Sequence, residues 1–140
     1  MRDAADAWID DGGLLRVGPQ SSGAEPGPAC YARGGTRATV TDAHVVLGHI
    51  AAVGFDSEDL TIDEHLAREA VSKDIAEPLQ WTVERAAWSI VQIATNNMAE
   101  LVRLATLRRG LDPRDFALVA FGGAGGLHAA DIARDIGLVF

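Results

Sequence analysis

The chain has 140 residues, enough for one hydrophobic core, and a formal net charge of −8. This acidity disfavours binding to nucleic acid phosphates, and no apolar run approaches the ~20 residues that a membrane helix needs. One cysteine cannot form an internal disulfide, and the acidic start of the chain is unlike a secretory signal, so we expect a cytoplasmic location.

A loop rich in glycine and proline occupies residues 18–35, between two short apolar segments. Strands are predicted at residues 14–17 and 38–40, and Thr41 or Asp42 is expected to cap a short helix over residues 43–50. Glycine permits close approach of the backbone, and proline lowers the entropy cost of ordering. We therefore expect this loop to fold tightly against other atoms.

Two helices are predicted next. A capping box at Thr61 and Glu64 opens a helix over residues 61–76, which Pro78 should end. A longer helix is expected over residues 83–109, with Gly110 as its stop. Its predicted apolar stripe consists of Val83, Ala86, Ala87, Ile90, Ile93, Ala94, Leu101, Leu104 and Ala105.

The long helix carries two polar or aromatic residues of interest. Asn97 falls within its apolar stripe, so we expect a buried amide whose partner is either backbone or a ligand. Trp88 lies on the opposite face, where it is either exposed or covered by a group outside this chain.

Residues 116–121 form an apolar run without polar alternation, which predicts a strand buried on both faces. A turn at residues 122–126 and a helix over residues 127–136 follow, and a further strand should begin at Leu138. This strand–glycine turn–helix unit indicates an α/β fold. Free N–H groups at the helix start attract phosphate. Four turn residues are therefore candidate nucleotide contacts: Gly122, Gly123, Ala124 and Gly125. The alternative is a purely structural turn.

Other candidates carry less specific patterns. Asp42 and His128 are the candidate catalytic residues. Asp42 is either a helix cap or a group that holds a Mg²⁺-bound water or a loop facing the nucleotide, and His128 is either structural or faces a phosphate or a metal. Cys30 is either a buried thiol or a nucleophile, but no histidine is near it in the sequence. The remaining histidines have no partner at metal-ligand spacing apart from a weak Asp42/His44 pair, so no metal site is predicted.

Three motifs occur in one order along the chain. The first is Gly-Pro-Gln-Ser-Ser-Gly-Ala-Glu-Pro-Gly-Pro-Ala-Cys-Tyr at residues 18–31, continued by Gly-Gly and by Thr-Val-Thr-Asp-Ala at residues 39–43. The others are Asn-Met-Ala-Glu at residues 97–100 and Phe-Gly-Gly-Ala-Gly-Gly-Leu-His-Ala at residues 121–129. Together they resemble the hydantoinase A / 5-oxoprolinase family of ATP-dependent cyclic amidases, which is related to acetone and acetophenone carboxylase subunits.

The resemblance implies an actin/Hsp70/sugar-kinase-like ATPase fold with a long central helix, in which a glycine turn of this kind contacts ATP. The complete enzyme would use ATP and Mg²⁺ to open a cyclic amide such as a hydantoin or 5-oxoproline. A hydantoinase B-type subunit is the implied partner, and a homo-oligomer is also compatible with the family.

Two departures from the family pattern limit this expectation. The phosphate-gripping Asp-x-Gly-Gly-Thr motif does not occur in the sequence, and Gly126 stands where the family usually has proline. Residues 1–140 are therefore expected to form a single domain or a truncated part of a hydantoinase A-like domain, inactive alone. The alternatives are a non-catalytic nucleotide-binding or interaction module and, third, a Rossmann-type cofactor domain.

Overall fold

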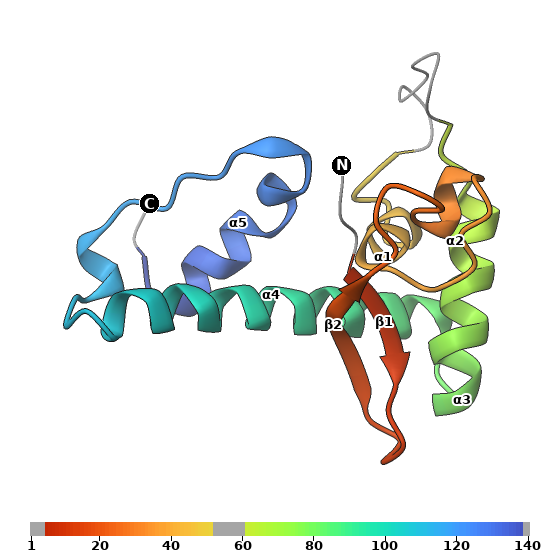
Figure 1. Cartoon of the computed structure of the whole chain (residues 1–140), viewed down its shortest axis with the longest axis horizontal. Helices are drawn as coiled ribbons and strands as arrows, with labels where there is room; N and C mark the ends of the chain where they lie inside the picture. The colour runs from red at the N-terminus through yellow and green to blue at the C-terminus, as the bar shows by residue number, and fades with distance from the viewer. Residues whose placement is uncertain (1–4, 52–60, 139–140) are drawn as a thin grey trace. The chain divides into compact units, whose positions relative to one another are not determined.

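The computed structural model describes residues 5–51 and 61–138. The chain divides into two compact units, one within residues 2–92 and the other within residues 93–140. Helix α4 (Val83–Leu107) contributes residues to both units (Figure 1). Its length agrees closely with the predicted helix, because periodicity over many turns is the most dependable sequence signal.

The first unit begins with a hairpin of two antiparallel strands, β1 (Ala5–Ile9) and β2 (Leu15–Ser21). Strand β2 confirms and extends the strand predicted at residues 14–17, whereas β1 was not predicted. Asp10 orders the connection, since its carboxylate accepts hydrogen bonds from the backbone N–H groups of Gly12 and Leu14. This is the local signature of an Asx-type turn.

The strand predicted at residues 38–40 is wrong. Thr39 makes only an isolated bridge to Asp6, and Val40 already starts helix α1 (Val40–Val46). The predicted cap at Thr41 or Asp42 is wrong as well: Thr39 is the N-cap, and Asp42 completes a capping box three residues later. Reciprocal bonds between Thr39 and Asp42 fix the helix start earlier than the apolar pattern suggested.

The second predicted helix is longer and more irregular than expected. It starts as α2 (Glu64–Val71), capped by Asp63 instead of Thr61, and continues through the π-helical η2 (Ser72–Ala76) into α3 (Glu77–Leu79). The helical segment continues through Pro78 and ends at Leu79, one residue later, with Gln80 as its left-handed C-cap. A 3-10 turn, η1 (Ala29–Tyr31), lies in the glycine- and proline-rich loop.

The core of the first unit is made by one face of each helix. Buried side chains come from α1, from the α2–η2 segment and from the first part of α4, and they include Val45, Val71, Ile75, Ala86 and Ile90. The stripe predicted for the long helix is therefore buried along this part of α4.

The second unit contains the rest of α4, the 3-10 turn η3 (Pro113–Asp115) and helix α5 (Gly122–Ile136). Ala99, Ile132 and Ile136 form its core, with partly buried Met98, Val102, Leu118 and Leu138 around them. The buried face of α4 changes here: Thr95 and Ala99 are buried, whereas Leu101 and Leu104 of the predicted stripe are exposed. Asn97 is also exposed, so the prediction of a buried amide is wrong.

The strand predicted over residues 116–121 does not form in the part of the chain that the structure describes. The segment is extended and largely exposed, and no described strand pairs with it. An apolar run becomes a strand only where a neighbouring strand supplies hydrogen-bond partners. The predicted glycine turn is wrong too, because residues 122–126 form the first turns of α5, whose remainder coincides with the helix predicted over residues 127–136.

The described residues thus form a mixed α/β structure, with one β-hairpin and a majority of helix. The strand predicted from Leu138 falls mostly outside the described residues. Among the described residues, no helix combines the length and apolar character required to cross a membrane.

Candidate functional site

The glycine-rich start of α5 keeps the features that attract an anion. Phe121 is the N-cap, and its side chain makes no capping hydrogen bond. A Cβ built at Gly122, Gly125 or Gly126 would have no described atom within 4 Å. The first turn of this helix therefore presents backbone N–H groups with no side chain of its own larger than the Ala124 methyl group, as a phosphate- or nucleotide-contacting turn requires.

His128 lies in the second turn of the same helix, after the glycines. It is only 3% exposed, and its Nδ1 lies 2.9 Å from the Thr95 Oγ1 of α4. The structure therefore brings His128 together with the predicted glycine contacts on one helix, but in a buried, hydrogen-bonded position. Thr95 was missed by sequence reasoning, because a threonine inside a long helix has no distinctive pattern.

Asp42 belongs to the first unit, where its carboxylate joins two segments. It accepts hydrogen bonds from the backbone N–H groups of Ala29 (3.3 Å), Cys30 (2.8 Å) and Thr39 (3.0 Å) and from the Thr39 hydroxyl (2.6 Å). Burial raises the pKa of Asp42 above its ordinary value, while the bonds from Thr39, Cys30 and Ala29 oppose that shift. The geometry makes Asp42 the anchor that fastens the loop at residues 29–30 to the start of α1.

Cys30, whose backbone N–H donates to the Asp42 carboxylate, is fully buried. Burial, followed by the neighbouring carboxylate of Asp42, raises the pKa of the Cys30 thiol well above its ordinary value. A thiol in this state is a poor nucleophile. The loop also brings the Gly35 Cα against the backbone carbonyl of Gly27, where no Cβ could be accommodated, as expected for a tightly folded loop.

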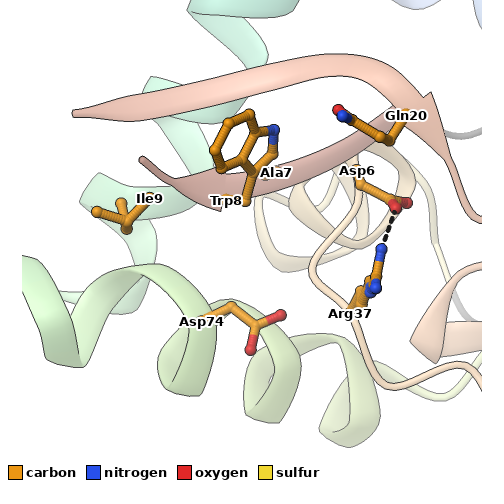
Figure 2. A pocket seen from close by; sticks show the side chains of 7 residues that line it. All are labelled: Asp6, Ala7, Trp8, Ile9, Gln20, Arg37 and Asp74. Atoms are coloured by element: carbon orange, nitrogen blue, oxygen red, sulfur yellow. Dashed lines mark hydrogen bonds and ion pairs between the residues drawn. The ribbon is translucent and has the colours of Figure 1, made fainter. Parts of the chain in front are cut away.

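A cavity of about 490 Å³ lies beside the hairpin, within the size range of small-molecule sites (Figure 2). The buried carboxylate of Asp6 borders it, held by the Ser22 hydroxyl at 2.6 Å and by Nη1 of Arg37 at 3.2 Å. Sequence reasoning missed this cavity because strand β1 was not predicted. Its lining residues are Asp6, Ala7, Trp8, Ile9, Gln20, Arg37 and Asp74.

Comparison with known proteins places the chain in a family. Residues 4–139 match the family model described as Hydantoinase/oxoprolinase. The chain therefore belongs to the hydantoinase/oxoprolinase family, which confirms the resemblance carried by its three motifs.

Sequence and structure both point to large ATP-dependent relatives. The chain is 44% identical over 131 residues to the caprolactamase subunit alpha of Pseudomonas jessenii, covering 94% of this chain and 19% of that protein. The crystal structure of ATP-dependent caprolactamase from Pseudomonas jessenii superposes with a TM-score of 0.87 at 42% identity, over 98% of this chain and 20% of the other. Nucleotide-free acetone carboxylase, described with a mechanism of ATP-dependent acetone carboxylation, gives a TM-score of 0.86 at 25% identity, over 96% and 19%.

The chain thus spans about one fifth of the length of these relatives. It is homologous to ATP-dependent cyclic amidases and to carboxylases, and it corresponds to a part of each.

Proposed function

We propose that the chain supplies nucleotide-contacting residues to an ATP-dependent enzyme that opens cyclic amides of the hydantoin, 5-oxoproline or caprolactam kind. The observation that carries this proposal is the uncapped, sterically open first turn of α5. Support comes from the relatives, since both solved structures are described as ATP-dependent and the caprolactamase is named for a cyclic amide.

The residues of this turn fit a nucleotide. Gly122, Gly123, Ala124 and Gly125 would place their backbone against it, because helix N-termini favour negative charge and small residues permit close approach. Bound ATP, accompanied by Mg²⁺, would supply phosphoryl chemistry that activates the amide oxygen.

Positioning roles are proposed for the other two candidates. His128, bonded to Thr95, would hold the second turn of α5 in place below the glycines. Asp42 would hold the loop at residues 29–30, because its oxygens already accept four hydrogen bonds.

At the level of the fold, we propose that residues 1–140 are part of a hydantoinase A-like domain of the actin/Hsp70/sugar-kinase-like class. A B-type second subunit is the proposed partner, because the Pseudomonas jessenii relative is itself named a subunit. The proposed substrate class follows from that relative and from the name of the family.

Calorimetric titration with Mg²⁺-ATP tests the nucleotide role. We expect the parent chain to bind ATP and Gly125→Val to bind at least about tenfold more weakly, because valine fills the open space while its helix propensity exceeds that of glycine. Ala105→Val, at an exposed position of α4, is the matched control and should bind like the parent. If Gly125→Val bound ATP as tightly as the parent chain, or if the folded parent gave no heat at millimolar ATP, the proposal that this turn contacts a nucleotide would be contradicted.

A non-catalytic nucleotide-binding module is the second candidate, favoured by the small share of the relatives that the chain spans. Phosphate release separates the two proposals. Because the chain is expected to be inactive alone, release is measured after addition of a fragment that carries the family's Asp-x-Gly-Gly-Thr motif. ATP binding without phosphate release in the presence of hydantoin, 5-oxoproline or caprolactam would then favour the module, whereas release stimulated by one of these amides would favour the enzyme.

A further inference from the structure

The cavity beside the hairpin has an aromatic wall and an acidic wall. Trp8 of β1 lies on the strand side and is 39% exposed, and Asp74 of η2 lies on the helix side (Figure 2). Ile9 adds apolar surface next to Trp8, and the exposed Gln20 of β2 also borders the space. At about 490 Å³, the cavity is large enough for a small organic molecule that contacts both walls.

The charges around this cavity do not cancel. Nη1 of Arg37 lies 3.2 Å from Oδ2 of Asp6, so these two residues form a pair that is neutral as a unit. Among the described residues, Asp74 has no ion-pair partner, and the one hydrogen bond that it accepts comes from the Ala38 N–H at 2.8 Å. A carboxylate has about four acceptor sites, so Asp74 retains both its negative charge and the capacity to accept further donors.

The π-helical turn η2 presents Asp74 to the cavity. The Glu77 N–H donates to the Ser72 carbonyl five residues earlier, so this turn holds one residue more than an α-helical turn. Ile75 and Ala76 are buried in the core, whereas Asp74 on the same turn faces the hairpin. Turns of this kind are rare and occur frequently at functional sites. The turn is therefore a second observation, independent of the cavity, that points to binding here.

We propose that the cavity binds a small organic cation, a primary ammonium group carried on an apolar chain. The ammonium group has three N–H donors, which the Asp74 carboxylate and the Gln20 carbonyl can accept. The electron-rich face of the Trp8 indole attracts a cation, and Ile9 offers apolar contact to the chain. This site lies in the first unit, so it is separate from the proposed nucleotide turn and does not depend on it.

An anion of the same size fits the charges poorly. Arg37 would attract it, but this guanidinium is already paired with Asp6, and a second carboxylate at Asp74 would repel it. The lining thus distinguishes ligands by the sign of their charge, which gives the proposal a direct test.

Nuclear magnetic resonance titration of the full chain with hexylammonium chloride and with sodium hexanoate makes this test. The two probes share an alkyl chain and differ in the sign of their charge. We expect hexylammonium to shift the Trp8 indole N–H and the Asp74 backbone amide in a saturable manner, and hexanoate to bind at least about tenfold more weakly, because the unpaired charge of the cavity is negative.

Asp74→Asn is the decisive variant, because its amide oxygen can still accept the hydrogen bond from the Ala38 N–H. It should bind hexylammonium at least about tenfold more weakly than the parent, with circular dichroism reporting an unchanged fold. Glu77→Gln removes the same charge from an exposed position of α3, keeps an acceptor for the Ser72 hydroxyl, and is the matched control that should bind like the parent.

Trp8→Leu supplies a second test, since it keeps an apolar side chain but removes the indole. We expect it to bind hexylammonium several-fold more weakly, followed through the Asp74 amide. Parent-like binding by Asp74→Asn, equal losses in Asp74→Asn and Glu77→Gln, equal affinity of the parent for hexanoate and hexylammonium, or no shift at Trp8 in the folded parent would each overturn the proposal.

Discussion

The Asp42 side chain holds two segments together, the loop at residues 29–30 and the start of helix α1 at Thr39. Its carboxylate accepts four hydrogen bonds from residues 29, 30 and 39, and it is fully buried. Asp42→Ala would leave these donors without an acceptor. Each buried, unsatisfied donor costs about 1–3 kcal/mol, so we expect the free energy of unfolding to fall by roughly 3 kcal/mol or more.

Urea unfolding followed by circular dichroism measures this change. Asp131→Ala is the control, because Asp131 forms a surface ion pair with Arg134 one turn away, and such pairs contribute about 0.5 kcal/mol or less. If Asp42→Ala were as stable as Asp131→Ala, the hydrogen bonds to this carboxylate would not hold the loop.

Sequence reasoning singled out Asp42 as a candidate but did not predict which hydrogen bonds its carboxylate accepts. The short Thr-Val-Thr-Asp pattern allows several capping arrangements, and which one forms depends on the loop at residues 29–30, which contributes two of the donors. Thr95 and Asn97 show the same limit. Both lie on α4, and only the position of α5 decides that Thr95 is buried and Asn97 exposed.

At the scale of elements, prediction succeeded where the signal was local. Helix α4 follows from a periodic pattern over many turns, and β2 follows from an apolar segment next to a turn. The strand expected at residues 116–121 failed because pairing depends on another segment of chain, which an apolar run does not specify. The prediction of a glycine turn was wrong because the low helix propensity of glycine predicts that no helix forms there, whereas residues 122–126 are the first residues of helix α5.

The start of α5 offers a direct test of its uncapped state. Phe121 is 85% exposed and has the extended backbone that suits an N-cap, with φ −143° and ψ 165°. Phe121→Ser would supply a hydroxyl acceptor for the free N–H groups of the first turn. We expect it to be more stable to urea than Phe121→Ala by about 1 kcal/mol, the usual contribution of a serine cap over alanine.

The two variants share the loss of the aromatic ring, so their difference isolates the cap. In the proposed nucleotide site, the serine hydroxyl would also compete for the same N–H groups, so Phe121→Ser should bind ATP more weakly than Phe121→Ala. Equal stability of the two variants would mean that the first turn of α5 has no unsatisfied donors in solution.

At the scale of the whole molecule, exposed apolar side chains concentrate in the second unit. They include Leu101, Leu104, Leu107, Val119 and Phe121, whereas its core rests mainly on Ala99, Ile132 and Ile136. Large exposed apolar areas commonly mark surfaces that contact other polypeptide. This distribution agrees with a chain that spans about one fifth of its relatives, one of which is named as an enzyme subunit.

The imbalance between the units predicts uneven stability. Residues in elements with few buried contacts open at a lower free energy than residues in a larger core. We expect the amides of α5 to exchange with deuterium at least about tenfold faster, relative to their intrinsic rates, than the Cys30 and Thr39 amides that donate to Asp42. Ile132→Ala should accelerate exchange in α5 further, because it truncates a buried isoleucine of the second core, and should leave the Cys30 and Thr39 amides unchanged. Hydrogen exchange measured by nuclear magnetic resonance resolves these amides separately. Equal protection in both units, lost equally in Ile132→Ala, would show that the chain unfolds as one cooperative body and that its small second core is stabilised together with the first.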